Sequence, residues 1–215
     1  MTGLFDSGTG GFNTALEIRR LLPNESLILL ADCGRAPFGE KSDREITDIA
    51  EENLRRLSAA GAERVLIACC TVSSLFDRLS EKARKTAVPI IAPTARAAER
   101  SSENRRIAVL ATEATVRSHA FKKAIRSCEV SEISTPELVR LAEEHSPESI
   151  WANEVIGRLA DRIAETGADT LVLGCTHFHS LADRIARETE KHGIKKIISS
   201  AREGAGELYR ILKTR

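Results

Sequence analysis

The sequence predicts an α/β protein with two pseudo-symmetric α/β domains, mainly parallel sheets, and an active site in the cleft between the domains. Apolar strand-like runs alternate with helical segments along the 215 residues, which is typical of parallel sheets joined by right-handed crossovers. The chain also repeats itself. A glycine, an alanine, an acidic residue, an apolar run and a cysteine occur at 61–69 and again at 167–175, 106 positions later. This repeat predicts that the two domains share one topology.

The first domain, which we place at residues 1–100, begins with a strand and a glycine-rich turn at 7–11. Between Ile46 and Leu57 the apolar residues recur at helical spacing, which predicts an amphipathic helix. Pro89 indicates an edge strand or the start of a strand. We expect strands at 3–6, 27–31, 64–68 and 88–91, and helices at about 12–22, 42–60 and 71–86.

The pattern begins again in the second domain, which we place at residues 101–200 after the polar segment 101–106. Gly167 ends a long helical segment and introduces the strand that leads to the second cysteine of the repeat. A C-terminal helix at 202–213 is free to pack back on the first domain. We expect strands at 107–111, 170–174 and 195–199, and helices at 115–127, 136–145, 148–166 and 180–192.

Composition and charge exclude several classes of partner. The net charge is +1, the basic residues are dispersed, and only 4% of residues are aromatic, so no nucleic-acid surface is expected. No apolar run approaches the length of a membrane span, and Met1 is followed by a strand rather than a signal peptide. The five cysteines are an odd number without CxxC spacing, which favours reduced thiols in the cytoplasm.

Two cysteines, Cys69 and Cys175, come where an apolar strand ends and a helix follows. A helix N-terminus carries a partial positive charge, so we expect it to lower the pKa of a thiol there. Thr71 and Thr176 follow and are able to cap the helices or donate to a ligand carboxylate, and His177 is near enough to exchange a proton with Cys175. One cysteine at such a place is more often inert core. A matched pair instead favours an acid/base pair that moves a proton from one face of a carbon to the other.

The spacing Cys175-x-His177-x-His179 also admits a metal site. On an extended strand the three side chains share one face, and Cys69 is able to complete a zinc tetrahedron. The apolar strand ends at Gly174, however, so this alternation is not expected to continue. We therefore expect no metal site.

The turn from Asp6 to Gly11 lies between a strand and a helix, where glycine loops bind phosphate. It lacks the lysine of a P-loop and the GxGxxG order of a dinucleotide fold. Asp6 suits a neighbouring thiol or a substrate ammonium group better than a phosphate. We therefore expect no cofactor.

Six motifs follow one another along the chain: Phe5-Asp6-Ser7-Gly8-x-Gly10-Gly11, Pro37-Phe38-Gly39-x-Lys41-Ser42, Ala68-Cys69-x-Thr71-x-Ser73, Ala111-Thr112-x-x-Thr115-Val116-x-Ser118, Pro136-x-Leu138-Val139-x-x-x-Glu143 and Leu173-Gly174-Cys175-Thr176-His177. Together, and in this order, they resemble the glutamate racemases of the cofactor-independent aspartate/glutamate racemase superfamily. The resemblance implies two α/β domains with the site between them. It also implies an isomerase that interconverts L- and D-glutamate without a cofactor and supplies D-glutamate for peptidoglycan.

The resemblance further implies a role for each matched residue. Cys69 and Cys175 are the catalytic thiols, of which the first deprotonates the D-enantiomer and the second the L-enantiomer. Asp6 assists Cys69 and His177 assists Cys175, while Glu143, by itself an ordinary solvated charge, supports the second thiol. The implied substrate-binding positions are Asp6, Ser7, Phe38, Gly39, Cys70, Thr71, Thr176 and His177.

Two of these positions depart from the family pattern. Cys70 stands where the family has an asparagine, so an amide that would bind a polar group of the substrate is missing, and Phe38 stands where it has a tyrosine. Three interpretations therefore stay open: a glutamate racemase, a relative that acts on aspartate or another substrate, and a catalytically weakened binding homologue. The expected partner is a small-molecule amino acid, with no nucleic acid and no membrane, and a homodimer is admitted.

Overall fold

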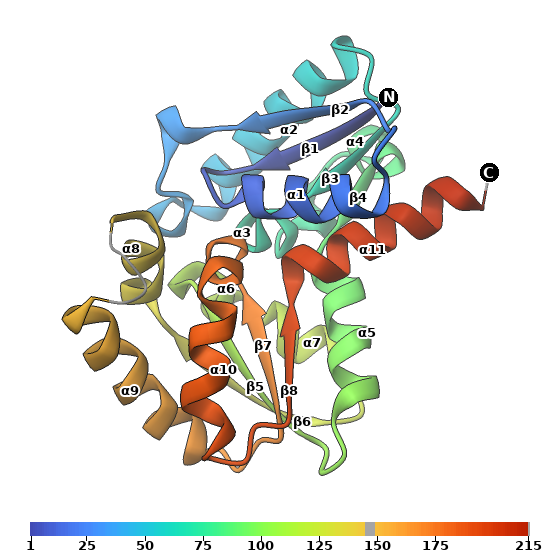
Figure 1. Cartoon of the computed structure of the whole chain (residues 1–215). Helices are drawn as coiled ribbons and strands as arrows, with labels where there is room; N and C mark the ends of the chain where they lie inside the picture. The colour runs from blue at the N-terminus through green and yellow to red at the C-terminus, as the bar shows by residue number, and fades with distance from the viewer. Residues whose placement is uncertain (145–148, 215) are drawn as a thin grey trace.

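Two parallel sheets, each of four strands, form the framework of the protein. The computed structural model describes residues 1–144 and 149–214. The strand order is β2-β1-β3-β4 in the first sheet and β6-β5-β7-β8 in the second, so both sheets have the same order. Figure 1 shows one sheet above the other, with helices packed around each. The predicted fold class, two similar α/β halves with parallel sheets, is confirmed.

The first sheet has β1 at its centre, paired with β2 on one side and β3 on the other. Its strands are β1 (Thr2–Asp6), β2 (Leu27–Ala31), β3 (Arg64–Ile67) and β4 (Ala87–Pro89). Its helices are α1 (Gly11–Leu21), η1 (Cys33–Arg35), η2 (Phe38–Glu40), α2 (Asp43–Ala59), α3 (Cys70–Ser73), η3 (Phe76–Arg78) and α4 (Glu81–Thr86). A capping box starts α2, because the Ser42 hydroxyl accepts from Glu45 N–H and the Glu45 carboxylate accepts from Ser42 N–H.

The second sheet has β5 in the place of β1 and β7 in the place of β3. Its strands are β5 (Arg106–Ala111), β6 (Glu129–Ser134), β7 (Thr170–Gly174) and β8 (Lys196–Ser199). The remaining helices are α5 (Ile91–Ser101), α6 (Glu113–Ser118), α7 (Ala120–Ala124), α8 (Pro136–Glu144), α9 (Ile150–Ala164), η4 (Thr176–Leu181), α10 (Ala182–Glu190) and α11 (Ser200–Lys213). No helix in the described part of the chain is long and apolar enough to cross a membrane.

Two predicted helices are wrong as continuous elements. The helix expected at 71–86 is divided into α3, η3 and α4, because Ser80 adopts an extended conformation and its side chain caps α4 by accepting from Ala83 N–H. The helix expected at 115–127 is divided into α6 and α7 by His119, whose φ of 52° lies in the left-handed region.

Among the strands and α-helices of the described residues, two have no counterpart in the sequence prediction. The first is α5, which begins directly after β4 and carries Pro93 in its first turn, where a missing N–H costs nothing. The second is β6, an edge strand whose only buried residues are Val130 and Ile133. The predicted helices at 136–145 and 148–166 are present as α8 and α9, and residues 145 and 148 lie outside the described residues.

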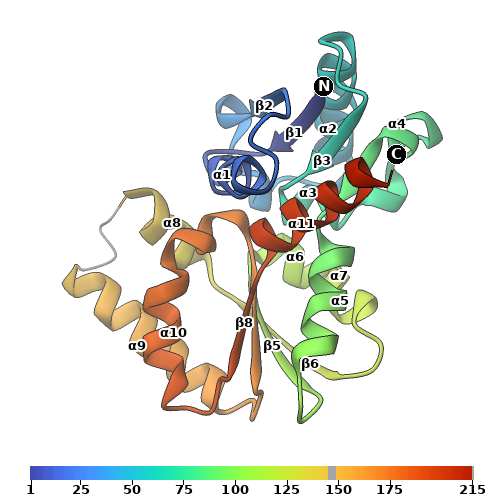
Figure 2. The same cartoon turned by 45° about the vertical axis from the view of Figure 1, so that its right-hand side comes forward.

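The C-terminal helix α11 connects the two halves. It leaves β8 of the second sheet and packs against α1 of the first half and against α5 (Figure 2). Helix α5 packs on β7 and β8, so its contacts lie with the second half although the predicted domain boundary follows it. Gly204 of α11 approaches Ile90 so closely that a Cβ atom on the glycine would lie 2.7 Å from the isoleucine Cδ1.

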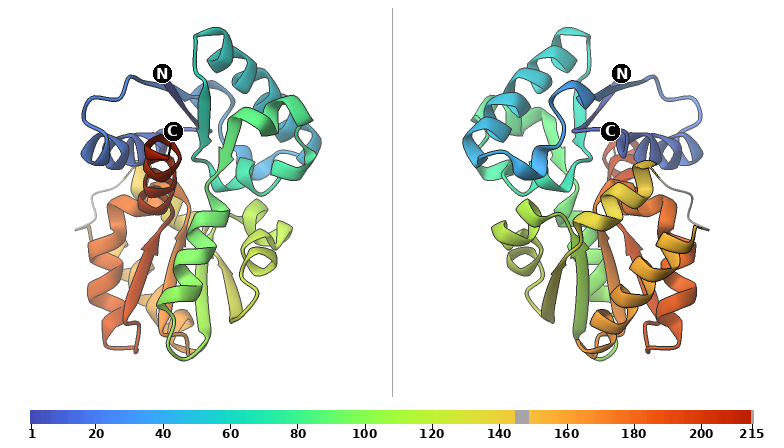
Figure 3. Two further views of the ribbon diagram at one scale, coloured as in Figure 1. Left: turned by 90° about the vertical axis from the view of Figure 1, so that its right-hand side faces the viewer. Right: turned by 90° about the vertical axis from the view of Figure 1, so that its left-hand side faces the viewer.

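A buried polar cluster also spans the two halves, where α1 lies against η4 (Figure 3). Glu17 of α1 is 6% exposed and accepts from Arg20 Nη1 at 2.6 Å. His179 of η4 reaches the same carboxylate through Nε2 at 3.3 Å, and its Nδ1 lies 2.8 Å from Ser199 Oγ. These contacts fix α1 relative to the loop that carries the second cysteine of the repeat.

Candidate functional site

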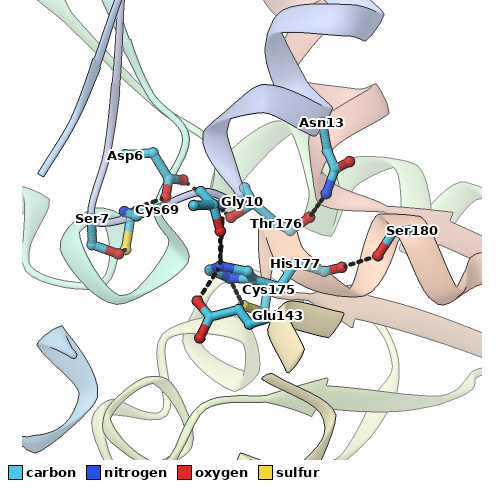
Figure 4. Close-up of polar contacts among 12 residues, drawn as sticks. Asp6, Ser7, Gly10, Asn13, Cys69, Glu143, Cys175, Thr176, His177 and Ser180 are labelled. Carbon is cyan, nitrogen blue, oxygen red and sulfur yellow. Dashed lines mark hydrogen bonds and ion pairs between the residues drawn. The ribbon is translucent and has the colours of Figure 1, made fainter. Parts of the chain in front are cut away.

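A cavity of about 570 Å³ opens between the halves, at the carboxyl ends of the central strands of both sheets. Open parallel sheets place their ligand sites at this edge. Of the eleven predicted site residues, ten line the cavity: Ser7, Phe38, Gly39, Cys69, Cys70, Thr71, Glu143, Cys175, Thr176 and His177. The structure thus brings together residues from η2, α3, α8 and η4 and from the loops that follow β1, β3 and β7 (Figure 4).

Asp6 is the exception, because its side chain is fully buried behind the cavity wall. Its Oδ1 accepts from Gly8 N–H at 2.9 Å and its Oδ2 accepts from the Thr176 hydroxyl at 3.1 Å. The Asp6 carboxyl thus links the two halves behind the cavity, and its contact with a substrate stays a prediction. Burial raises the pKa of Asp6 to about 7, although the bonds from Gly8 and Thr176 oppose the rise.

Cys69 lies on the first-half side of the cavity as the N-cap residue of α3. It is 6% exposed, and the Ser7 hydroxyl donates to its Sγ at 3.0 Å. Burial, followed by the nearby carboxyl of Asp6, raises the pKa of the Cys69 thiol to about 11. The Ser7 hydroxyl and the backbone N–H groups at the start of α3 lower it.

Cys175 lies on the second-half side of the same cavity, where β7 ends. Its Sγ is 3.6 Å from His177 Nδ1. On the other side of the ring, His177 Nε2 is 2.9 Å from a carboxylate oxygen of Glu143 and 3.1 Å from Gly10 N (Figure 4). The imidazole therefore stands between a thiol and a carboxylate, with one nitrogen facing each.

The two partners of His177 Nε2 require different protonation states. Gly10 N–H donates to Nε2 only when that nitrogen is unprotonated, which leaves the proton on Nδ1 facing Cys175. Glu143 accepts from Nε2 only when that nitrogen carries a proton. Burial lowers the pKa of His177 and the Glu143 charge opposes this, so the ring is neutral at neutral pH. The arrangement lets the ring gain and lose a proton while each nitrogen keeps a partner.

The sequence predicts lowered pKa values for both thiols, and this prediction is wrong. Burial raises the pKa of Cys175 well above its usual value, with the other two cavity cysteines and Asp6 adding to the rise. The helix effect is present, since N–H groups of α3 lower the pKa of Cys69, but desolvation outweighs it. Both thiols therefore hold their protons at neutral pH, and a neighbouring group has to remove the proton before either acts as a base.

Three threonine hydroxyls meet in the cavity wall. Thr71 Oγ1 of the first half lies 3.0 Å from Thr112 Oγ1 of the second, and Thr112 Oγ1 lies 3.0 Å from Thr115 Oγ1. Of these, Thr71 and Thr112 line the cavity. Each hydroxyl carries one proton and is free to rotate it, so this pair is able to donate to a bound carboxylate.

Cys70 and Phe38 contribute to the wall without a charge. Cys70 is 2% exposed, and burial raises its pKa well above the usual value, while a hydrogen bond with Ser200 opposes that rise. The bond connects the cavity wall to the first residue of α11. Phe38 is 3% exposed and packs in the core of the first half with Ile46.

The histidines of the Cys175-x-His177-x-His179 spacing have different partners. His177 faces Gly10 and Glu143, whereas His179 faces Glu17 and Ser199 outside the cavity. The three side chains therefore do not converge as the metal interpretation requires. Within residues 1–144 and 149–214 no group of three His, Cys, Asp or Glu side chains is placed to hold a metal ion.

Sequence reasoning missed several groups at the site. Gly10 supplies the N–H that meets His177, and Asn13 Nδ2 donates to the Thr176 carbonyl at 2.9 Å. Thr112 belongs to one of the six motifs and follows a predicted strand, so the sequence indicated its place at the site. The cavity also contains four unpredicted residues that stand at none of the fixed positions of the motifs: Ala36, Glu40, Glu113 and Arg140.

A comparison with protein families agrees with this geometry. A family model described as Asp/Glu/Hydantoin racemase matches residues 16–208. The chain therefore belongs to the Asp/Glu/hydantoin racemase family, and the protein is an isomerase of the amino-acid racemase class.

The most similar proteins within that family include curated glutamate racemases. The one from Desulforudis audaxviator is 36% identical over 190 residues, which are 86% of this chain and 70% of that protein. The one from Gloeobacter violaceus is 42% identical over 186 residues, 84% of this chain and 69% of that protein.

Solved structures give the same result for the fold. A glutamate racemase isoform from Bacillus anthracis superposes with a TM-score of 0.90 at 30% identity, covering 100% of this chain and 82% of that one. The glutamate racemase from Francisella tularensis in complex with D-glutamate has a TM-score of 0.89 at 25% identity, covering 99% of this chain and 81% of that one.

Replacing Gly10 by alanine is expected to lower kcat/KM for the racemase reaction by about 10²-fold, the loss typical of a misplaced catalytic group. Gly10 has a helical φ of −56°, so the backbone tolerates alanine. The new Cβ, however, would lie 2.3 Å from Thr176 Oγ1 and 2.8 Å from His177 Nδ1. Steady-state rates with the matched variant Gly206→Ala check the result, since a Cβ at Gly206 meets nothing within 4 Å. Equal rates for the two variants would show that this close packing is not needed.

Proposed function

We propose that this protein interconverts L-glutamate and D-glutamate with two cysteine thiols as the acid and the base. The observation that carries the proposal is that Cys69 and Cys175 follow equivalent strands of the two sheets and line one cavity. The volume of about 570 Å³ lies within the range of small-molecule sites, so it admits an amino acid. The glutamate racemases among the relatives support glutamate as the substrate.

In the proposed reaction one thiolate removes the α-proton, and the other thiol then donates its proton to the opposite face of the carbanion. Each reaction direction uses the same two groups with their roles exchanged. By resemblance to the family, Cys69 deprotonates the D-enantiomer and Cys175 the L-enantiomer. The high pKa of each buried thiol makes its thiolate a stronger base towards a weakly acidic C–H group.

Each thiol has a group placed to help it ionise. His177 Nδ1, 3.6 Å from Cys175 Sγ, takes the thiol proton, and Glu143 then stabilises the resulting imidazolium through Nε2. On the other side the Ser7 hydroxyl donates to Cys69 Sγ, which stabilises the thiolate. Asp6 determines the charge behind this thiol: because its pKa is raised to about 7, its carboxyl is mostly neutral below that pH and mostly charged above it.

Hydrogen-bond donors around the cavity are proposed to bind the substrate and to stabilise the carbanion. Thr71 and Thr112 present hydroxyls from the two halves, so a carboxylate near them is held by donors placed before the reaction. Thr176, whose hydroxyl donates to Asp6, is proposed to contact the substrate from the same cavity wall. Ser7, Phe38, Gly39 and Cys70 complete the proposed substrate contacts. We also propose that the protein supplies D-glutamate for peptidoglycan, that it is located in the cytoplasm and that it forms a homodimer.

The test is exchange of the Cα proton in deuterated water under reducing conditions. We expect both enantiomers of glutamate to incorporate deuterium and to racemise, whereas aspartate enantiomers exchange at least about tenfold more slowly, the size of effect expected for one methylene. Faster exchange of aspartate than of glutamate would make aspartate the proposed substrate. Cys70, in place of the family asparagine, would then explain the altered specificity. Exchange of neither amino acid would favour a weakened binding homologue.

A further inference from the structure

The charges around the cavity are unbalanced. Glu40, Glu113 and Glu143 line it, and among the described lining residues only Arg140 carries a permanent positive charge. A dicarboxylic amino acid has two negative charges and one positive charge. The three glutamates therefore repel its carboxylates, whereas the guanidinium of Arg140 attracts them.

The position of Arg140 fits a role at the cavity mouth. The two thiols are almost fully buried, whereas Arg140 is an exposed residue of α8, so the guanidinium lies on the outer part of the cavity lining. Arg140 precedes Glu143 by three residues, and side chains at this spacing share one face of a helix. Helix α8 lies below the loop between β2 and α2, which carries Phe38 and Gly39 on the opposite side of the cavity (Figure 1).

The packing of Arg140 also limits its movement. Its Cζ lies 5.7 Å from the centroid of the Trp151 ring on α9, a cation–π contact that holds the side chain. A guanidinium held in this way binds a carboxylate with a smaller loss of side-chain entropy than a free one.

We propose that Arg140 binds the side-chain carboxylate of the incoming dicarboxylic amino acid and thereby selects for dicarboxylic substrates. The inference rests on the proposed function, because the reacting Cα has to lie between the two buried thiols while the side chain extends towards the mouth. Arg140 acts in this scheme on capture and specificity, and the proton transfers at Cα do not involve it.

The test compares Arg140→Gln, Arg140→Lys and the control Arg158→Gln, which removes the same charge from an exposed residue of the neighbouring helix α9 outside the cavity. Glutamine keeps a long side chain against Trp151. We expect Arg140→Gln to raise the KM for glutamate about five- to tenfold with kcat changed less than about twofold, and to flatten the dependence of kcat/KM on salt. Arg140→Lys is expected to restore most of the KM and the salt dependence.

A binding measurement separates this inference from the proposed function. Glutarate, a dicarboxylate without an amino group, is expected to bind the wild-type protein in calorimetry and to lose about five- to tenfold in affinity in Arg140→Gln, whereas the affinity for glutamine is expected to stay the same. An unchanged KM and glutarate affinity in Arg140→Gln, or an equal change in Arg158→Gln, would overturn the role of Arg140. If the wild-type protein exchanges no Cα proton of glutamate, the proposed function fails, and glutarate binding still decides the role of Arg140.

Discussion

Replacing Cys69 or Cys175 by serine is expected to reduce the racemisation of glutamate by about 10³-fold in both directions, because general acid–base groups contribute effects of this order. Every turnover needs one thiolate and one thiol, on opposite faces of the substrate. A serine hydroxyl is far less acidic than a thiol, so the variant lacks a competent base on one side. Both cysteines line the same cavity, so a single replacement leaves the other thiol in place. Circular dichroism and racemisation rates, started from each enantiomer, measure the effect.

A substrate with a leaving group at Cβ separates the two thiols, because elimination needs only one base. Cys69→Ser is expected to keep elimination from the L-enantiomer, and Cys175→Ser that from the D-enantiomer. The neighbouring Cys70→Ser serves as the control, since Cys70 bonds to Ser200 in the wall and is expected to leave the division between enantiomers intact. Loss of turnover in Cys70→Ser with tolerance of Cys69→Ser would place the first catalytic thiol one residue later.

Replacing Asp6 by asparagine is expected to change both activity and the dependence of stability on pH. The folded pKa of about 7 lies above the usual 3.8, so the folded state keeps a proton that the unfolded chain has lost. The free energy of unfolding of the wild-type protein therefore falls as the pH rises from about 4 through 7, by up to about 1.4 kcal/mol per pH unit from this group. In Asp6→Asn this slope is absent, while kcat falls by about 10²-fold because the ionisable group beside Cys69 is lost.

Urea unfolding between pH 4.5 and 8 measures this difference. Asp169 provides a control without a slope in this range, because bonds from Asn104 N–H and the Ser102 hydroxyl outweigh its burial and lower its pKa. Its contribution to stability is present above pH 3.8 and is lost as the pH falls below that value. An Asp6→Asn variant with the wild-type pH slope would show that the Asp6 carboxyl is ionised throughout this range.

The sequence predicted the framework because the framework repeats. The phrase that ends at Cys69 recurs at Cys175, and both phrases form central strands of equivalent sheets. The edge strand β6 escaped prediction because one of its sides is open, so only Val130 and Ile133 are buried and no apolar run marks it. The division at His119 escaped as well, since a left-handed φ at a non-glycine residue depends on tertiary packing.

Most of the residues that line the cavity were predictable from the motifs, but the pKa values of its thiols were not. Ten residues named from motifs line one cavity, since parallel strands bring their carboxyl ends to one edge. The pKa of Cys69 instead depends on how completely the two halves exclude water, which no local pattern records. The burial of Asp6 escaped prediction for the same reason, because its carboxyl accepts a hydrogen bond from Thr176, 170 residues later in the chain.

The two places where the chain crosses between the sheets determine how the cavity is able to open. One crossing follows β4 at Ile90 and the other follows β8 at Ser200, and the contact of Ile90 with Gly204 sets them side by side. Two adjacent crossings are expected to act as a hinge, which permits the halves to rotate about one axis and resists sliding and twisting. If the halves rotate about this hinge, we expect the separation of the two thiols to change while their orientation towards each other is kept.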